Sequence, residues 1–253
     1  MGSNGDVSLR GRSVMGELDK AIEAMRKGIP VLIHDDYGRE DEVDYVIHAS
    51  YVTVDKIYEM RTLAGGLICY AMPLPAGEML GLRYIADILA GIEPLGRLAE
   101  RTLGYGDKPA FSLWVNHLKA RTGIRDRDRA LTIRELDRVV NLIYSGRVEE
   151  ARKLFYESFM APGHVPILLG RRLGERRGHT ELSLHLAMLA GMTPSTVIVE
   201  MLDRGEALSV EEARRVSREK GYPLVEGSEI IAEVERRGED MYCRYNLCKN
   251  RHG

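Results

Sequence analysis

The feature that most constrains the fold is an apolar run followed at once by a concentration of acidic side chains. Residues 29–33 read Ile-Pro-Val-Leu-Ile, and the ten residues from Asp35 to Asp44 carry six carboxylates. The run predicts a buried strand, and the acids predict a loop at its carboxyl end, where ligand sites of α/β proteins lie. Six acids in ten residues repel one another unless a cation, a substrate or bulk water takes up the charge. A solvated acidic turn is the alternative, because most charge runs are of that kind.

A second polar cluster lies far along the chain and offers the basic groups that the first one lacks. Residues 176–181 read Arg-Arg-Gly-His-Thr-Glu, and a strongly apolar segment follows from Leu182 until Gly191. This pattern predicts a helix with His179 and Thr180 at its N-terminus. The free backbone N–H groups of that position favour an anion, and a neighbouring arginine would add a guanidinium. The alternative is a capped helix start with surface arginines.

The composition is that of an ordinary globular protein with a large core. The 253 residues are 44% hydrophobic and 29% charged, which allows one large domain or two small ones. A formal net charge of -2 gives no global reason to expect nucleic acid or an anionic membrane as partner. The first residues lack the apolar core of a signal peptide, and no stretch approaches the roughly 20 apolar residues of a membrane span. We therefore expect a cytoplasmic protein.

Hydrophobic periodicity and turn signals predict helices alternating with strands. The strands at 29–33 and 45–49 are expected to be antiparallel because so short a loop joins them. Thr132 and Glu135 match a capping box, and residues 162–164 predict a turn. Residues 75–107 have a helical pattern that glycines interrupt, and we interpret them as an insertion or lid. Helices are predicted at 15–27, 53–61, 132–145, 148–159, 179–190, 210–220 and 227–236, and further strands at 65–72, 111–115, 165–169 and 195–200.

Six motifs, in order and spanning roughly residues 15 to 235, resemble the 3,4-dihydroxy-2-butanone-4-phosphate synthases of riboflavin biosynthesis. The acidic loop resembles the family's Asp-Asp-x-x-Arg-Glu-Asn-Glu-Gly-Asp sequence, although Val43 stands where the family usually has glycine. Residues 125–127, Arg-Asp-Arg, replace a small Ser- or Thr-containing stretch. The other matches are Gly66-Leu-Ile-Cys69, Arg121-Thr-Gly-Ile with Asp128-Arg129, Pro162-Gly-His-Val165, Arg176-x-Gly-His-Thr-Glu181 and Val197-Ile-x-Glu200.

The resemblance implies a single α/β domain, with a mixed β-sheet flanked by helices in a layered arrangement. It implies a homodimeric lyase that uses Mg²⁺ or Mn²⁺ to convert ribulose 5-phosphate to 3,4-dihydroxy-2-butanone 4-phosphate and formate. The segment at 116–117 and the insertion look closer to archaeal stand-alone members. The domain is expected at 13–237, between a flexible N-terminus at 1–12 and a tail at 238–253. Alternatives are another metal-dependent phosphosugar isomerase or lyase, and a non-catalytic nucleotide- or RNA-binding relative, which would not need the metal ligands.

The resemblance also assigns roles to individual residues. Glu40 and His179 resemble the family's metal ligands, and hard carboxylate with one imidazole suits Mg²⁺ or Mn²⁺. The loop at 35–44 is expected to be the lid that excludes water. Expected sugar contacts come from Arg39, Glu40, Asp44 and Glu200, phosphate contacts from Arg176, Arg177, Gly178, His179 and Thr180, and proton transfers from Glu200, His164 and Glu42.

Overall fold

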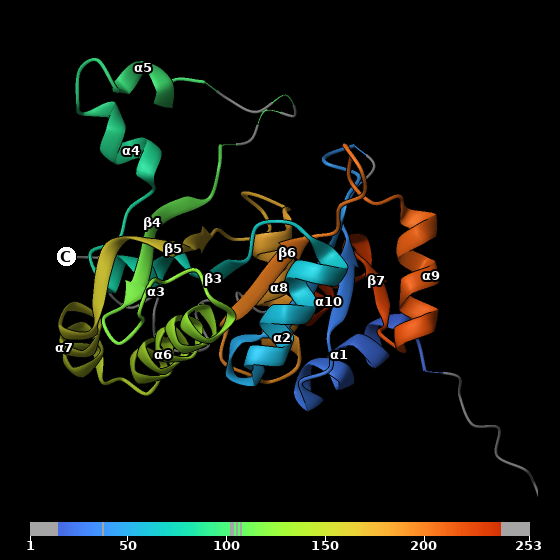
Figure 1. Cartoon of the computed structure of the whole chain (residues 1–253). Helices are drawn as coiled ribbons and strands as arrows, with labels where there is room; N and C mark the ends of the chain where they lie inside the picture. Colours follow the sequence, from blue (N-terminus) through green and yellow to red (C-terminus); the bar gives the residue numbers. More distant parts are fainter. Residues whose placement is uncertain (1–14, 37, 102–103, 105, 107, 239–253) are drawn as a thin grey trace, which may run out of the picture.

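A seven-stranded mixed β-sheet with helices on both faces organises the chain (Figure 1). The structure is a computed structural model that describes residues 15–36, 38–101, 104, 106 and 108–238. The flexible N-terminus predicted at 1–12 and the predicted tail beyond Gly238 lie outside the described residues. The single, layered α/β domain that the sequence predicts is confirmed.

The strand order β4-β5-β3-β6-β2-β1-β7 mixes parallel and antiparallel neighbours. The pairs β1–β7 and β3–β5 are parallel, and the other pairs are antiparallel, including the predicted pair β1–β2. The strands are β1 (Val31–His34), β2 (Val43–His48), β3 (Cys69–Pro73), β4 (Phe111–His117), β5 (Phe159–Gly170), β6 (Thr196–Glu200) and β7 (Leu224–Glu226). The short edge strand β7 was not predicted.

Two separate apolar cores lie on opposite faces of this sheet, because successive side chains of a strand alternate between faces. In β1, Leu32 belongs to one core and Ile33 to the other. The first core includes residues of α2 (Val54–Glu59), α6 (Asp126–Tyr144), α7 (Val148–Ser158) and α9 (Val210–Lys220), and the second includes residues of α1 (Glu17–Lys27), α8 (His179–Leu189) and α10 (Gly227–Arg237). The helix α8 is buried along its whole length, as its apolar sequence predicts.

Two local predictions are wrong. The capping box at Thr132 does not start a helix, because α6 already begins at Asp126 and Thr132 is fully buried inside it. Its hydroxyl donates to the carbonyl of Asp128 and accepts from the backbone N–H of His117, so it joins α6 to β4. The predicted turn at 162–164 is a bulge within β5: Val115 and Asn116 are adjacent in β4, yet their partners in β5 lie five positions apart, at 165 and 160.

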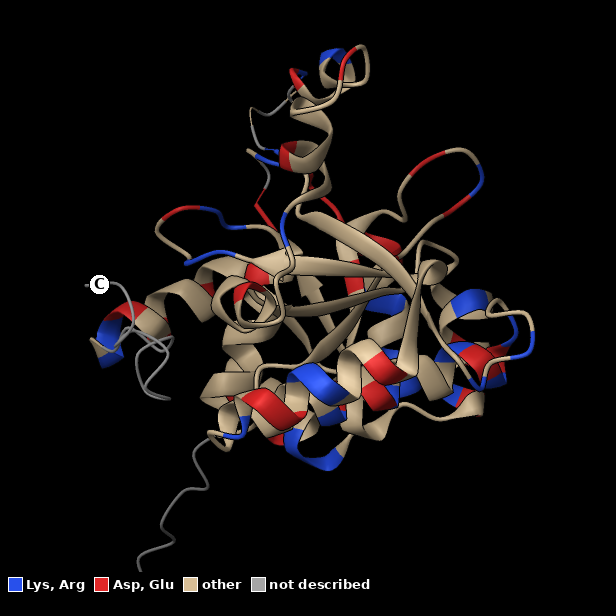
Figure 2. Ribbon diagram, turned by 90° about the vertical axis from the view of Figure 1, so that its left-hand side faces the viewer, with Lys and Arg blue, Asp and Glu red and all other residues tan. Residues whose placement is uncertain are grey.

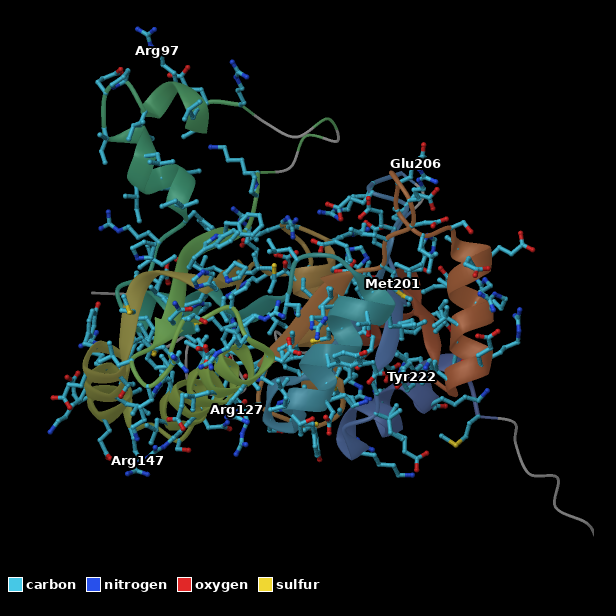
Figure 3. The ribbon with its side chains drawn as sticks, in the orientation of Figure 1. Arg97, Arg127, Arg147, Met201, Glu206 and Tyr222 are labelled. Atoms are coloured by element: carbon cyan, nitrogen blue, oxygen red, sulfur yellow. The ribbon has the colours of Figure 1, made fainter. Side chains whose placement is uncertain are left out.

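The insertion at 75–107 carries three short helices, α3 (Leu74–Met79), α4 (Ile85–Ala90) and α5 (Gly96–Ala99). The helices α4 and α5 project from the body of the molecule as an arm, with Arg97 at its far end (Figures 1 and 3). The predicted lid role of this segment stays a prediction. Among the described helices, none combines the length and the apolar character that a bilayer crossing needs. Acidic and basic residues are interspersed along the helices (Figure 2).

Candidate active site

The acidic loop is held together by its own first carboxylate. The side chain of Asp35 is fully buried and accepts hydrogen bonds from the backbone N–H groups of Glu40, at 3.3 Å, and Glu42, at 3.1 Å. It also accepts a hydrogen bond from Nη1 of Arg39 at 2.9 Å. The loop is therefore an ordered turn at the end of β1, which fixes the starting directions of the side chains of Glu40 and Glu42.

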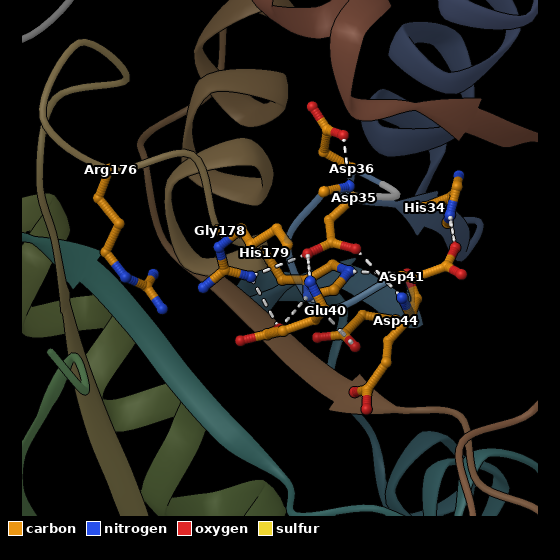
Figure 4. Close-up of polar contacts among 12 residues, drawn as sticks. His34, Asp35, Asp36, Glu40, Asp41, Asp44, Arg176, Gly178 and His179 are labelled. Atoms are coloured by element: carbon orange, nitrogen blue, oxygen red, sulfur yellow. Dashed lines mark hydrogen bonds and ion pairs between the residues drawn. The ribbon is translucent and has the colours of Figure 1, made fainter. Parts of the chain in front are cut away.

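The start of α8 brings His179 into this loop. Its Nδ1 lies 3.4 Å from Oε2 of Glu40 and 3.7 Å from Oδ1 of Asp44, and its Nε2 lies 3.2 Å from the carbonyl oxygen of Glu42 (Figure 4). One donor atom each from Asp35, Glu40 and His179 lie within 4.8 Å of one another. The two predicted metal ligands, which are 139 positions apart in the sequence, thus face each other.

The electrostatics of this cluster favour a positive charge. Burial lowers the pKa of His179, but the carboxylates of Asp44, Glu40 and Asp35 outweigh it and raise that pKa to about 9. Burial, reinforced by neighbouring carboxylates, raises the pKa of Asp44 to about 7. The pKa of Glu42 is raised by burial and by Glu40. Crowded carboxylates repel one another, which favours their protonated form; a nearby positive charge favours the ionised form.

The pairing of β2 with β6 places Glu200 directly opposite Asp44. The carboxylate of Glu200 is held in place by the backbone N–H of Leu67, which donates to Oε2 at 2.8 Å. A Cβ on Gly66 would lie 2.5 Å from both the carbonyl oxygen and Oε2 of Glu200. The glycine of the Gly-Leu-Ile-Cys motif therefore lets the chain pass close to this carboxylate.

A buried ion pair shapes the opposite side of the helix start. Glu181 is fully buried, and its Oε2 lies 2.5 Å from Nη1 of Arg176 and accepts from the backbone N–H of Gly178 at 3.2 Å. The backbone N–H of Arg171 donates to Oε1 at 3.0 Å. A Cβ on Gly178 would lie 2.4 Å from Nη1 of Arg176 and 2.7 Å from Nη2 of Arg39. Two guanidinium groups thus lie against the first residue before α8.

A cavity of about 160 Å³ joins these groups. This volume is below the roughly 300–1,000 Å³ of drug-sized ligand sites and suits a small metabolite. Its apolar wall comes from β3, β4, β5 and β6. The polar lining consists of six predicted site residues, Glu40, Asp44, Arg176, His179, Thr180 and Glu200, and the buried Cys69 also lines it.

Five predicted site residues are outside the lining of this cavity, namely Arg39, Glu42, His164, Arg177 and Gly178. The carbonyl oxygen of Glu42 contacts His179, but its side chain is outside the lining set. Arg177 lines a separate groove, which runs between the acidic loop and α10. His164 lies on the bulge of β5, where its backbone N–H donates to Asn116. It precedes the cavity residue Leu168 by four positions, a distance of about 13 Å along an extended strand.

Sequence reasoning did not single out two carboxylates that organise the site. Asp35 orders the loop and Glu181 anchors Arg176, although neither was assigned a role. Glu181 is the third residue of a helix that follows an N-cap glycine, the spacing at which an acid reaches back to the cap N–H. That spacing could have identified it.

Comparisons with known proteins agree with this geometry. Residues 19–233 match the family model of 3,4-dihydroxy-2-butanone 4-phosphate synthase. A protein of that description from Archaeoglobus fulgidus is 40% identical over 229 residues, 87% of this chain and 94% of the relative, and one from Methanosarcina mazei is 41% identical over 224 residues, 85% and 89%. A solved structure of such a synthase in complex with two magnesium ions is 26% identical, with a TM-score of 0.68 over 88% of this chain and 99% of that one.

Proposed function

The chain belongs to the 3,4-dihydroxy-2-butanone 4-phosphate synthase family, a family of lyases that convert ribulose 5-phosphate in riboflavin biosynthesis, and from this premise we propose how its residues perform that reaction. The observation that carries the proposal is the single cavity in which Glu40, His179, Asp44 and Glu200 meet Arg176. The products are 3,4-dihydroxy-2-butanone 4-phosphate and formate. The reaction proceeds in the cytoplasm.

Glu40 and His179 hold a divalent cation, Mg²⁺ or Mn²⁺. A carboxylate and an imidazole 3.4 Å apart are a hard donor set that suits these ions. The buried Oδ1 of Asp44 makes no hydrogen bond to any described residue, so this side of the site also has an uncompensated acceptor. Asp35 is not a ligand in this proposal, because its oxygens already accept from the loop. When bound, the cation polarises the sugar's carbonyl and adjacent hydroxyl oxygens.

The phosphate binds at the start of α8. Backbone N–H groups and the positive end of the helix dipole favour an anion there, and Thr180 adds a hydroxyl group on the cavity wall. Arg176 supplies a positive charge whose direction is fixed by the buried Glu181. Arg39, which lies against Gly178, and Asp44 face the sugar. The role of Arg177 at the phosphate is a prediction without support from the cavity lining.

Glu200 is the proposed acceptor of the proton next to the substrate carbonyl. The N–H of Leu67 orients its carboxylate from one side, and the side chain borders the cavity on the other. Asp44 lies directly opposite in the pairing of β2 with β6, so a second carboxylate borders the cavity beside Glu200. Glu42 and His164 remain predicted participants in later proton transfers.

The protein works as a homodimer in this proposal. The edge strand β4 and its surroundings expose large apolar side chains, with Leu118 56% exposed, Ile124 53% and Met160 50%. His164 lies on the same bulge as Met160, so a second copy on this edge would cover both. Light scattering gives the mass in solution, and a concentration-independent monomer would refute the dimer.

The deciding experiment is incubation of the parent protein with ribulose 5-phosphate and Mg²⁺, with and without EDTA, followed by carbon NMR. We expect one formate for each four-carbon ketone phosphate, and none of either with EDTA. An isomerised five-carbon sugar without formate would identify a phosphosugar isomerase instead. The absence of any turnover would favour a binding protein.

A further inference from the structure

A histidine that is outside the cavity lies between two acidic side chains. His34 is the last residue of β1 and is fully buried, and its ring contacts polar groups. Its Nδ1 is 2.5 Å from Oε2 of Glu226, and its Nε2 is 3.0 Å from Oδ1 of Asp41 (Figure 4). His34 therefore joins two chain segments, the acidic loop and β7, through its two ring nitrogens.

The partner of His34 in the acidic loop has an uncommon backbone conformation. Asp41 has a φ of +56°, in the left-handed region that residues with a Cβ rarely adopt. Its neighbours on both sides, Glu40 and Glu42, donate their backbone N–H groups to Asp35. The left-handed residue thus lies between two amides that are anchored to Asp35, directly after Glu40 in the chain.

The second partner of His34, Glu226, connects it to strand β7. Glu226 lies in register with His34 across the parallel pair β1–β7, so its side chain points to the same side of the sheet. Its second oxygen, Oε1, accepts from Nη2 of Arg214 on α9 at 2.6 Å. His34 is consequently held from the side of β7 by a short contact with Glu226, which is itself paired with Arg214.

Consecutive residues at a strand end point to opposite faces, so His34 and Asp35 reach the loop from different sides. Asp35 holds the backbone of the loop, and His34 holds the side chain of Asp41. We propose that His34 is a positioning residue: it keeps Asp41 left-handed, and thereby sets the direction of Glu40 and the affinity of the site for a divalent cation. The inference rests on the proposed function in one respect, which is that Glu40 binds the cation.

The test replaces Asp41 in two ways. Asp41→Gly removes the partner of His34 and is unstrained at positive φ, whereas Asp41→Asn keeps an oxygen acceptor and tolerates the left-handed conformation. Substituting a residue that orients a metal ligand typically lowers the metal affinity ten- to hundredfold. We expect Asp41→Gly to bind Mn²⁺ at least tenfold more weakly, measured by electron paramagnetic resonance of free Mn²⁺, and Asp41→Asn to bind within threefold of the parent.

Two further measurements separate positioning from general damage. The kcat of Asp41→Gly should return to near the parent value at saturating cation, while the amides of Glu40 and Glu42 exchange hydrogen faster than in the parent. His34→Gln, which cannot hold both carboxylates, should also weaken Mn²⁺ binding. Asp203→Asn is the matched control, because it removes a carboxylate from an exposed turn outside the site and should change nothing.

Parent-like Mn²⁺ affinity and exchange in Asp41→Gly would overturn the inference, and so would an equal loss in Asp41→Asn. Failure of the proposed function looks different: the parent itself would release no formate. In that case the amide exchange of Glu40 and Glu42 still tests whether His34 orders the loop.

Discussion

A substitution at Gly178 can displace Arg176, the proposed phosphate contact, and Arg39, the proposed sugar contact, without altering the backbone. It has φ of -85° and ψ of 172°, an extended conformation that alanine adopts freely. An added Cβ would lie 2.4 Å from Nη1 of Arg176 and 2.7 Å from Nη2 of Arg39, where ordinary contacts are 3.4–4 Å. Gly178→Ala therefore requires the Arg176 guanidinium to withdraw by about 1 Å.

That movement has a cost that can be bounded. Arg176 is held at 2.5 Å by the buried Glu181, and Arg39 at 2.8–2.9 Å by Glu40 and Asp35, so neither group retreats without stretching an ion pair. A charge-assisted hydrogen bond contributes about 1.5–3 kcal/mol. If this free energy is lost from phosphate binding, the affinity for phosphate falls roughly ten- to hundredfold. Lost from folding, about 2 kcal/mol lowers Tm by roughly 4–8 °C in a chain of this size.

The assay compares KM for ribulose 5-phosphate, Ki for inorganic phosphate and Tm in Gly178→Ala and in Gly174→Ala. Gly174 lies in the same connection, and a Cβ there would meet nothing within 4 Å. We expect KM and Ki to rise at least tenfold in the first variant and to stay at parent values in the control. Equal phosphate affinity in both variants would show that the arginines beside Gly178 do not hold the anion.

Three other predictions follow from the same site and from the loop before α6. Glu40→Gln should lose more than 99% of turnover at saturating Mg²⁺ with Tm within a few degrees, since the side chain borders the cavity and is not part of either apolar core; substantial residual turnover argues against a metal ligand. Glu200→Gln should lose about 10²–10⁴-fold in kcat with little change in KM, as expected for a general base, and steady-state kinetics decide it. Asp128, whose pKa is held far below its usual range by Arg125 and by the N–H groups of Thr122 and Gly123, should stabilise the fold by about 1–3 kcal/mol at pH 7. Because a lowered folded-state pKa contributes stability above the unfolded pKa of about 3.9, the difference between the parent and Asp128→Asn in urea unfolding should shrink steadily below pH 4; a pH-independent difference contradicts this.

Local patterns in the sequence were sufficient for most of the fold. The apolar run before the acidic loop and the helix after Gly178 are both rich in apolar residues along their whole length, and both elements form as predicted. Thr53 accepts the N–H of Lys56 and caps α2 as its position indicates. In these places the residues that decide the conformation are neighbours in the sequence, so a reading of the sequence captures them.

Predictions failed where a distant residue decides the local structure. Thr132 has the spacing of a helix cap, but its hydroxyl accepts from the backbone N–H of His117, 15 positions away, inside a helix that already begins at Asp126. The sequence predicts His179 at a helix N-terminus but does not signal its burial: the residue is 5% exposed, and its side chain lies beside two carboxylates, those of Glu40 and Asp44. The contact of His34 with Glu226 joins residues 192 positions apart, and no periodicity signals it.

The register of β2 against β6 affects the stability of the folded chain and its resistance to proteolysis. Asp44 and Glu200 are direct cross-strand neighbours in the sheet, and like charges in that position destabilise a sheet. The proposed cation would offset this repulsion, and at ten times its Kd it would add about 1.4 kcal/mol to the stability of the folded chain. That is about a tenfold drop in the unfolded fraction that proteases can attack. The proposed cation would therefore protect the chain from proteolysis as well as serve the reaction.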